Sequence, residues 1–208
     1  ISGLIRFETK NERLVVYIMP HTRFELDSNQ TFERNYVERV KPILDSIFSA
    51  LRADQRYKFN WAETVFFKEW YLHLDKKEQQ LVKKFVKEGR LYFVNGASTE
   101  SLASEMHPYE LIELLSIGGR FLREEFGVQP HIYWDVNSEG SSAILPTILA
   151  EMDYDVIVTD YVGSLLTQDL KRLRSLHMHW RAYPYGNKSQ LFTHIPPILA
   201  SIEGKWAF

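Results

Sequence analysis

Short apolar runs of strand length alternate with helical patterns along most of the 208-residue chain. The runs read as strands are Leu14–Met19, Tyr57–Ala62, Leu91–Val94, Ile132–Val136, Val156–Thr159, Leu176–Trp180 and Leu191–His194. No two-residue hairpin turn is recognised between consecutive runs, so the pattern predicts an α/β protein with a parallel sheet, open or closed into a barrel. The first run is continuously apolar up to Pro20, which is typical of a parallel strand buried on both faces.

Helical patterns fill the intervals between these runs. The stripe from Val37 to Leu51 is amphipathic, and Pro42 within it predicts a kink or a shifted start. Further helices are predicted over Val65–Leu74, Lys76–Lys87 and Ala143–Met152, and over Pro108–Phe126 with an interruption at Gly118-Gly119.

In parallel α/β proteins, functional side chains gather where the strands end at their carboxyl edge. We therefore expect one rim to carry the polar residues that follow the predicted strands. These are His21, Glu63, Asn95, Asp135 to Glu139, Asp160, Arg181 and His194.

Composition and charge narrow the class of protein. The chain is 45% hydrophobic and 25% charged, which indicates a globular protein, and we expect one domain over residues 1–208. A net charge of −2 gives no reason to expect nucleic acid or an anionic membrane as a partner, and no apolar run is long enough to span a bilayer. The absence of cysteine weakly favours a reducing compartment, but two glycosylation sequons, at Asn29 and Asn187, favour the secretory pathway.

Several landmarks in order resemble the amino-terminal part of the catalytic domain of family 38 glycoside hydrolases, the zinc-dependent Golgi and lysosomal α-mannosidases. The match runs from about Arg13 to Thr193, and the last landmark includes His194. They are Val15–Thr22, Trp61–Phe67, Gly89–Gly96, Phe121–Pro130, Trp180-Arg181 and Leu191–His194. The resemblance implies a parallel (β/α)7 barrel and a lumenal or extracellular location. It also implies that this chain is a fragment of a longer one, because the family's catalytic domain is longer.

The resemblance implies a retaining glycosidase with an aspartate nucleophile after the fourth strand. Zinc would be held by a His-x-Asp after the first strand, by the nucleophile and by a later histidine, which we expect to lie beyond Phe208. In this sequence the nucleophile position is Asn137, within Trp134-Asp135-Val136-Asn137. A neutral amide cannot form the glycosyl-enzyme ester that retention needs.

The zinc-histidine position is occupied by Arg23, whose guanidinium has no lone pair and a permanent positive charge. Glu25 and Asp27 follow it and remain possible ligands only if the protein is active. We therefore interpret His21, Arg23, Glu25, Asn137 and Arg181 as a vestigial site, with His21 and Arg181 in structural places at the rim. No metal and no other cofactor is expected there.

Two functions stay open. The favoured one is a catalytically inactive α-mannosidase-like glycoprotein of the secretory pathway with a structural or weak carbohydrate-binding role. Its partner would be a carbohydrate or a glycoprotein, or it would form part of a larger assembly. A glycan at Asn29, in the loop after the first strand, would obstruct a sugar pocket and supports this reading. The alternative is an active zinc-dependent α-mannosidase with a site rebuilt from Glu25, Asp27, Asp135 or Glu139.

Two smaller signals have structural readings that we favour. Glu63, Asp135 and Glu139 could form a relocated acid pair. Against this, Asp135 alternates to the side opposite Trp134 and Val136, and Glu139 reads as a solvated loop carboxylate. His177 and His179 have an i, i+2 spacing that can bind a metal from a strand, and polar packing is the simpler role.

Overall fold

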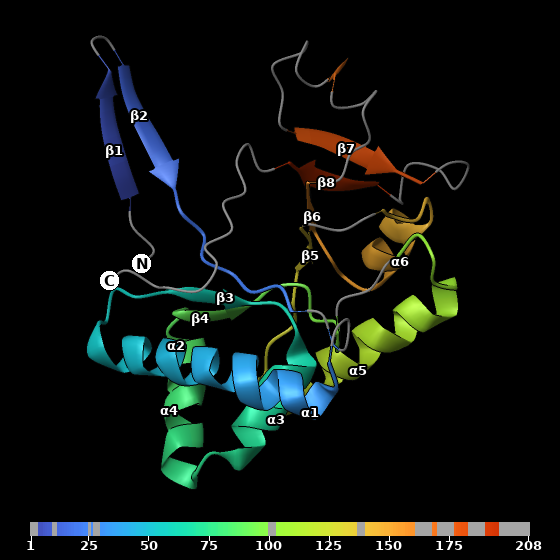
Figure 1. Ribbon diagram of the computed structural model, residues 1–208. Coiled ribbons are helices and arrows are strands. Elements are labelled where there is room, and N and C mark those ends of the chain that lie inside the picture. Colours follow the sequence, from blue (N-terminus) through green and yellow to red (C-terminus); the bar gives the residue numbers. More distant parts are fainter. Residues whose placement is uncertain are drawn as a thin grey trace. The chain divides into compact units, whose positions relative to one another are not determined.

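The computed structural model describes residues 4–9, 12–24, 26, 30–99, 103–136, 140–160, 168–169, 177–182 and 190–195 (Figure 1). The chain divides into two compact units, which are described separately. The first unit comprises Ile1–Ser101 and Met106–Pro130, and the second comprises Leu102–Glu105 and His131–Phe208.

The first unit opens with a hairpin that the sequence reading did not predict. Strand β1 (Leu4–Thr9) pairs antiparallel with β2 (Glu12–Tyr17), and Thr9 stands opposite Glu12. The prediction of a buried parallel strand over Leu14–Met19 is therefore wrong. The segment Leu4–Thr9 supplies an adjacent antiparallel partner, and Ile18 and Met19, beyond β2, are 40% and 49% exposed.

Two parallel strands follow, β3 (Phe59–Trp61) and β4 (Leu91–Phe93). The segment before β3 in the chain also runs parallel to it, because His21 forms a β-bridge with Asn60. Both the backbone N–H and the side-chain amide of Asn60 donate to the Pro20 carbonyl, at 3.1 and 3.0 Å. Three extended segments therefore lie side by side with the same direction.

The predicted amphipathic stripe is helical, but its regular α-helix starts only at Lys41, after a π-helical turn. It consists of α1 (Phe32–Asn35), a π-helical turn η1 (Tyr36–Val40) and α2 (Lys41–Ala53). Pro42 lies in the first turn of α2 and has no N–H to donate, so regular α-helical bonding cannot continue through it. The expected shift at Pro42 is confirmed.

Helices α3 (Thr64–His73), α4 (Lys76–Lys87) and α5 (Pro108–Phe126) match their predicted ranges within one residue at either end. A capping box between Asp75 and Glu78 starts α4. The expected interruption of α5 at Gly118-Gly119 is wrong, because the helix runs through both glycines. Gly118 instead allows close packing: a Cβ there would lie 2.2 Å from the Gly96 carbonyl oxygen.

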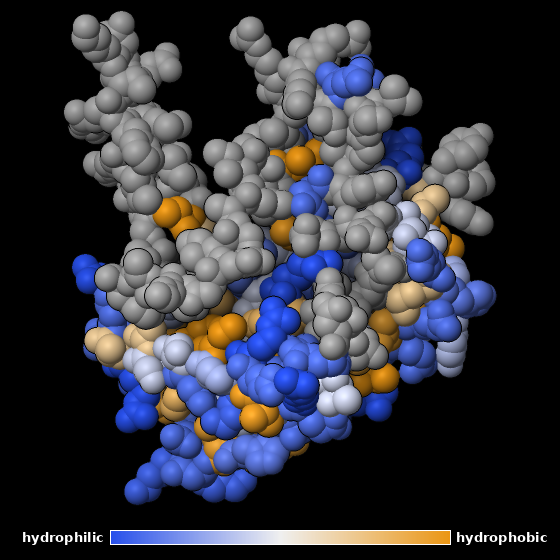
Figure 2. Space-filling view, in the orientation of Figure 1, coloured by the Kyte–Doolittle hydropathy of each residue, from blue (hydrophilic) through white to orange (hydrophobic). Residues whose placement is uncertain are grey.

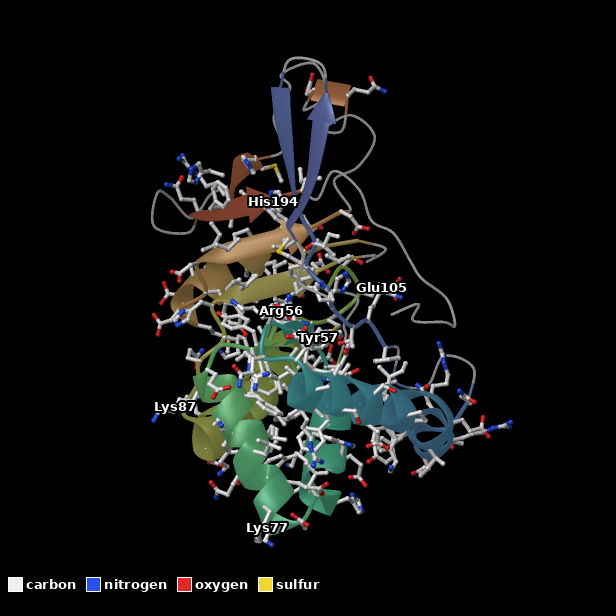
Figure 3. The ribbon with its side chains drawn as sticks, turned by 90° about the vertical axis from the view of Figure 1, so that its left-hand side faces the viewer. Arg56, Tyr57, Lys77, Lys87, Glu105 and His194 are labelled. Carbon is white, nitrogen blue, oxygen red and sulfur yellow. The ribbon has the colours of Figure 1, made fainter. Side chains whose placement is uncertain are left out.

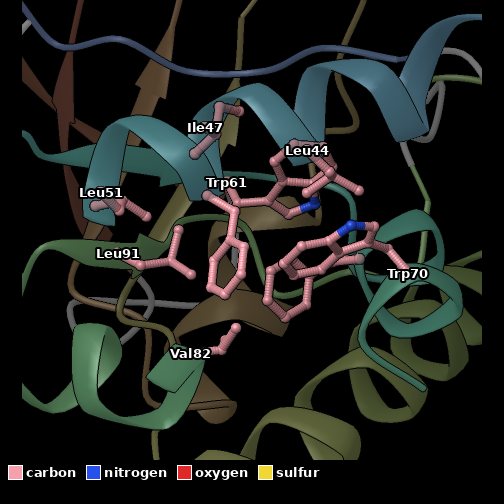
Figure 4. Close-up of a pocket in the computed structure, with 9 residues that line it drawn as sticks. Leu44, Ile47, Leu51, Trp61, Trp70, Val82 and Leu91 are labelled. Atoms are coloured by element: carbon pink, nitrogen blue, oxygen red, sulfur yellow. The ribbon is translucent and has the colours of Figure 1, made fainter. Parts of the chain in front are cut away.

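The core of the first unit lies between the β3–β4 sheet and these helices (Figures 1 and 4). Alternate strand residues point into it, and the helices add a dense set of rings, among them Phe67, whose ring meets Phe93 edge to face at 4.9 Å. The gap that remains between them is about 10 Å³ and has an apolar lining, so it is too small and too dry for a ligand. Its lining is Leu44, Ile47, Phe48, Leu51, Trp61, Phe67, Trp70, Val82 and Leu91.

The second unit contains a four-stranded sheet in the order β5-β6-β8-β7 and helix α6 (Leu145–Glu151). Its strands are β5 (Ile132–Asp135), β6 (Val156–Thr159), β7 (His177–Arg181) and β8 (Gln190–His194). The first three in spatial order are parallel, as predicted, but β7 is antiparallel to β8. Only positions 182–189 separate these two strands, and a parallel crossover needs roughly a dozen residues or more.

The fold is thus a mixed α/β arrangement with parallel sheets. Figure 2 shows mainly hydrophilic residues over the helices at the bottom of the view, interspersed with smaller hydrophobic areas. Within the described ranges, no helix combines the length and the apolar character needed to cross a membrane.

Candidate functional site

The carboxyl ends of three parallel segments meet at one edge of the first unit. The segment through His21, strand β3 and strand β4 place residues 21–24, 62–63 and 94–96 at this edge. The sequence prediction that His21, Glu63 and Asn95 share a rim is confirmed by this pairing.

Glu63 is the buried carboxylate of this edge, with only 2% of its surface exposed. The Thr22 hydroxyl donates to one of its oxygens at 2.8 Å, and the Phe24 backbone N–H donates to the other at 2.9 Å. Thr22 in turn accepts the Ala62 N–H at 3.2 Å. A buried carboxylate is tolerated when hydrogen bonds surround it, so these contacts let Glu63 fix the chain here.

Arg23 lies between the two residues that Glu63 holds, and its side chain is half-buried. His21 precedes them with its Nδ1 3.1 Å from the Thr22 carbonyl oxygen, to which it donates in the Nδ1–H tautomer. This local hydrogen bond and the backbone bridge to Asn60 agree with a structural role for His21.

The loop after β4 reverses through two residues with left-handed backbone, Asn95 (φ 70°) and Gly96 (φ 73°). It is then tied to the first turn of α3, where the Thr64 hydroxyl and backbone N–H donate to the Ala97 carbonyl at 2.8 and 3.2 Å. The edge of the first unit is therefore rigidly built.

The second unit has a corresponding edge, where β5, β6 and β8 end. Register places Asp135 beside Thr159 and Val158 beside His194. Asp135 is only 5% exposed and shares the buried side of β5 with Tyr133, opposite to Trp134. The alternation predicted that Asp135 and Trp134 lie on different sides, but it did not predict that Asp135 is buried.

Arg181 lies at the opposite end of this sheet. Because β7 is antiparallel, Arg181 stands opposite Gln190 at the start of β8 and donates to its side-chain oxygen at 3.1 Å. The expectation that Arg181 lies on the same rim as Asp135 and His194 is wrong. The residue of β7 that reaches this rim is His177, directly opposite His194.

The His177 and His194 rings approach each other closely, with 3.1 Å between their Nδ1 atoms. Burial, and to a smaller extent the neighbouring His177, lowers the pKa of His194. Sequence spacing had drawn attention to His177 and His179, but His179 stands opposite Phe192. The 177–194 pair was missed because it depends on an antiparallel register that the strand pattern did not reveal.

The remaining predicted residues, Glu25, Asp27, Asn29, Asn137, Glu139 and Asn187, lie outside the described residues. Within the part of the chain that is described, no three His, Cys, Asp or Glu side chains gather closely enough to hold a metal ion together.

Comparison with known proteins decides the family. Residues 13–204 match the glycosyl hydrolases family 38 N-terminal domain. The chain belongs to this family. Among its relatives, α-mannosidase B of Dictyostelium discoideum is 34% identical over 198 residues, covering 86% of this chain, and α-mannosidase of Canavalia ensiformis is 29% identical over 199 residues, covering 91%. The chain spans only about a fifth of the length of these relatives, 19% and 20% respectively.

Solved structures agree with the family 38 fold. An α-mannosidase from Enterococcus faecalis aligns with a TM-score of 0.68 at 13% identity, covering 85% of this chain and 19% of that one. A 4-α-glucanotransferase from Thermococcus litoralis aligns at 0.60 with 14% identity, covering 85% and 26%. At such identities the likeness concerns the fold alone.

Of the positions at which the family pattern holds zinc, the described residues include position 23. Position 23 falls between two anchored neighbours and carries a guanidinium, which cannot donate an electron pair to a cation. Arg23 itself therefore cannot be a zinc ligand.

Proposed function

We propose that this chain forms part of a family 38 protein that does not hydrolyse mannosides and that serves a structural or weak carbohydrate-binding role. Asn137 carries the proposal. It follows β5 by two residues, at the position where the family pattern has its nucleophilic aspartate. A retaining glycosidase must form a covalent ester at this position, and a carboxamide cannot.

Arg23 supports the same conclusion from the first unit. Glu63 holds residues 22 and 24, so the backbone at position 23 has little freedom to bring a different ligand into place. A fixed positive charge where the family pattern has a metal-binding histidine disfavours a divalent cation. The nucleophile and the metal site are thus both altered.

The architecture we propose is a single (β/α)7-barrel-like domain to which residues 1–208 contribute, within a longer protein. Support comes from the parallel strand pairs in each unit and from the likeness to an α-mannosidase structure. We further propose a lumenal or extracellular location with N-linked glycans at Asn29 and Asn187, and a carbohydrate or glycoprotein partner. The sequons and the family membership support this setting.

The complete protein that contains this chain can be tested directly. We expect no zinc bound through position 23 or 137, and no hydrolysis of an aryl α-mannoside above the rate in buffer. Stoichiometric zinc together with turnover would overturn the proposal and favour the rebuilt site. In that case Asp135→Asn should lower the turnover, whereas a scaffold has no activity for this substitution to remove.

Sugar binding distinguishes the two roles within the proposal. Titration with manno-oligosaccharides, without turnover, should show saturable binding if the protein acts as a weak lectin. No binding at millimolar sugar would leave the structural role as the function. Neither result alters the expectation for hydrolysis.

A further inference from the structure

We infer that His177 and His194 form a two-histidine site for a divalent transition-metal ion of the zinc, nickel and copper group. The inference is independent of whether the protein hydrolyses mannosides. Neither histidine belongs to the positions of the family zinc pattern named above, and both lie in the second unit.

Strand register brings the two rings together. His177 begins β7 and His194 ends β8, and the antiparallel pairing makes them direct partners. The rings lie 5.0 Å apart between centroids and are inclined by 34°. The pair therefore stands at the edge where β5, β6 and β8 end, which in parallel sheets is the usual place for ligands.

The distance between the two Nδ1 atoms fits a shared metal ion. Imidazole nitrogens bind zinc at about 2.0–2.1 Å, so two of them at angles of roughly 90–110° are separated by about 2.9–3.4 Å. The observed separation is 3.1 Å. The two nitrogens are thus already at the separation that one shared ion requires.

The protonation states of the rings are compatible with such a site. Without metal, a neutral pair at this distance shares a hydrogen bond from one Nδ1–H to the other Nδ1. With metal, both rings carry their proton on Nε2 and both Nδ1 atoms donate lone pairs. The donor ring changes tautomer by exchange with water, and no net proton is lost from the pair.

Two described side chains of the same strand pair differ in their distance from the site. Phe192 lies beside His177 with 5.3 Å between ring centroids and restricts that ring on one side. Arg181 is at the far end of the same strand pair, where it is held by Gln190. The proposal assigns two protein ligands, and water or an external ligand would complete the coordination. Figure 3 marks the position of His194 on its strand.

Titration of the complete protein with Ni²⁺ or Zn²⁺ tests this site. His177→Gln and His194→Gln should each weaken one binding event by at least about tenfold, because even loss of an outer-shell partner costs roughly 10–100-fold in affinity. The matched control is His179→Gln, on the same strand and the same face but opposite Phe192. It should retain the affinity within about twofold, because His179 packs against Phe192 and supplies neither of the two ligand atoms.

The same experiment can overturn the inference. Unchanged binding in both His177→Gln and His194→Gln, or equal loss in His179→Gln, would contradict a site made by this pair. A second measurement does not depend on variants that fold: a crystal of the unaltered protein soaked in Ni²⁺ should show an anomalous-scattering peak between the two Nδ1 atoms. Its absence at saturating metal would also rule the site out.

Discussion

Glu63 shows at the scale of one residue how a strand-end carboxylate can serve structure. Its two oxygens hold the chain on both sides of Arg23, through a side-chain hydroxyl and a backbone N–H. The sequence reading placed Glu63 on the rim and favoured a structural role over an acid pair. The hydrogen bonds to Thr22 and Phe24 explain that role.

Replacing this carboxylate should destabilise the first unit. Glu63→Gln removes the charge and places an amide N–H₂ near one of two donors, so we expect a loss of about 1–2 kcal/mol in the free energy of unfolding. Denaturant unfolding of the protein measures it. Glu124→Gln, on the exposed face of α5, is the control and should change stability by less than about 0.5 kcal/mol. Equal effects of the two substitutions would argue against the clamp.

Tyr36 predicts a pH dependence. Burial raises its pKa to about 12, with further contributions from Glu69 and Asp45. The folded state therefore keeps the phenol proton where the unfolded chain loses it, and stability falls as the pH rises from roughly 10, the usual tyrosine pKa, towards about 12.

Tyr36→Phe should remove part of that alkaline decline while changing stability little at neutral pH. Unfolding temperatures measured from about pH 8 to about pH 11.5, on both sides of the onset at roughly pH 10, provide the comparison. The half-exposed Tyr92→Phe serves as control and should keep the decline seen in the unaltered protein. A Tyr36→Phe profile parallel to that of the control would contradict the prediction.

Residue types at strand ends could be read from the sequence, but their partners could not. The contact between Thr22 and Glu63 joins positions 41 apart, and the His177–His194 contact requires a register that only the paired strands reveal. Arg181 was misplaced for the same reason. Sequence identifies which chemistry is available, and pairing decides where it lies.

Two neighbouring glycines in α5 show how a helix is fitted to its surroundings. A Cβ on Gly118 would meet backbone atoms, at 2.2 Å from the Gly96 oxygen and 2.7 Å from the Ala97 carbonyl carbon. A Cβ on Gly119 would meet only the Arg123 guanidinium, at 3.2 Å. The two positions have the same helical backbone and differ in what faces them.

Alanine at each glycine should therefore have opposite effects. Gly118→Ala forces α5 away from the loop and should cost about 1–3 kcal/mol or more, the usual range for overpacking. Gly119→Ala needs only a side-chain movement and should gain up to about 1 kcal/mol from helix propensity. Denaturant unfolding of both variants measures the difference. Destabilisation by both to the same extent would show that the contact with Gly96 is not limiting.

Most helices and the parallel pairs of strands could be predicted, because periodicity and strand order carry that information. The β1–β2 hairpin could not, since its first strand is a short run that has no distinct turn signal after it. The direction of β7 could have been inferred from the short stretch that joins it to β8. The length of the β7–β8 loop would have predicted the antiparallel direction, which the pattern of apolar runs does not specify.

At the scale of the whole molecule, this chain is a family 38 region that supplies only a fraction of a relative's length. Each unit presents the carboxyl ends of parallel strands at one edge. The family resemblance predicted from sequence is confirmed. The loss of activity, the barrel and the glycans stay predictions.

Glycosylation can be checked on the complete protein secreted from a eukaryotic host. We expect glycopeptides at Asn29 and Asn187, each abolished by replacing that asparagine with glutamine. Mass spectrometry before and after enzymatic glycan removal gives the answer. Thr31→Ser is a matched control, because it keeps both the sequon and a hydroxyl that can cap α1. Unmodified peptides at both sites would contradict the proposed secretory setting.

The turn after β4 couples the evolution of positions 96 and 118, which are distant in the sequence. Gly96 has a backbone that other residues rarely adopt, and its carbonyl rests where a side chain at position 118 would have to go. We therefore expect that a substitution at position 118 is tolerated only together with a change in the loop at position 96. In homologues where position 118 has become larger, the loop at 95–97 should have changed its length or path as well, so the two sites should vary together in a family alignment.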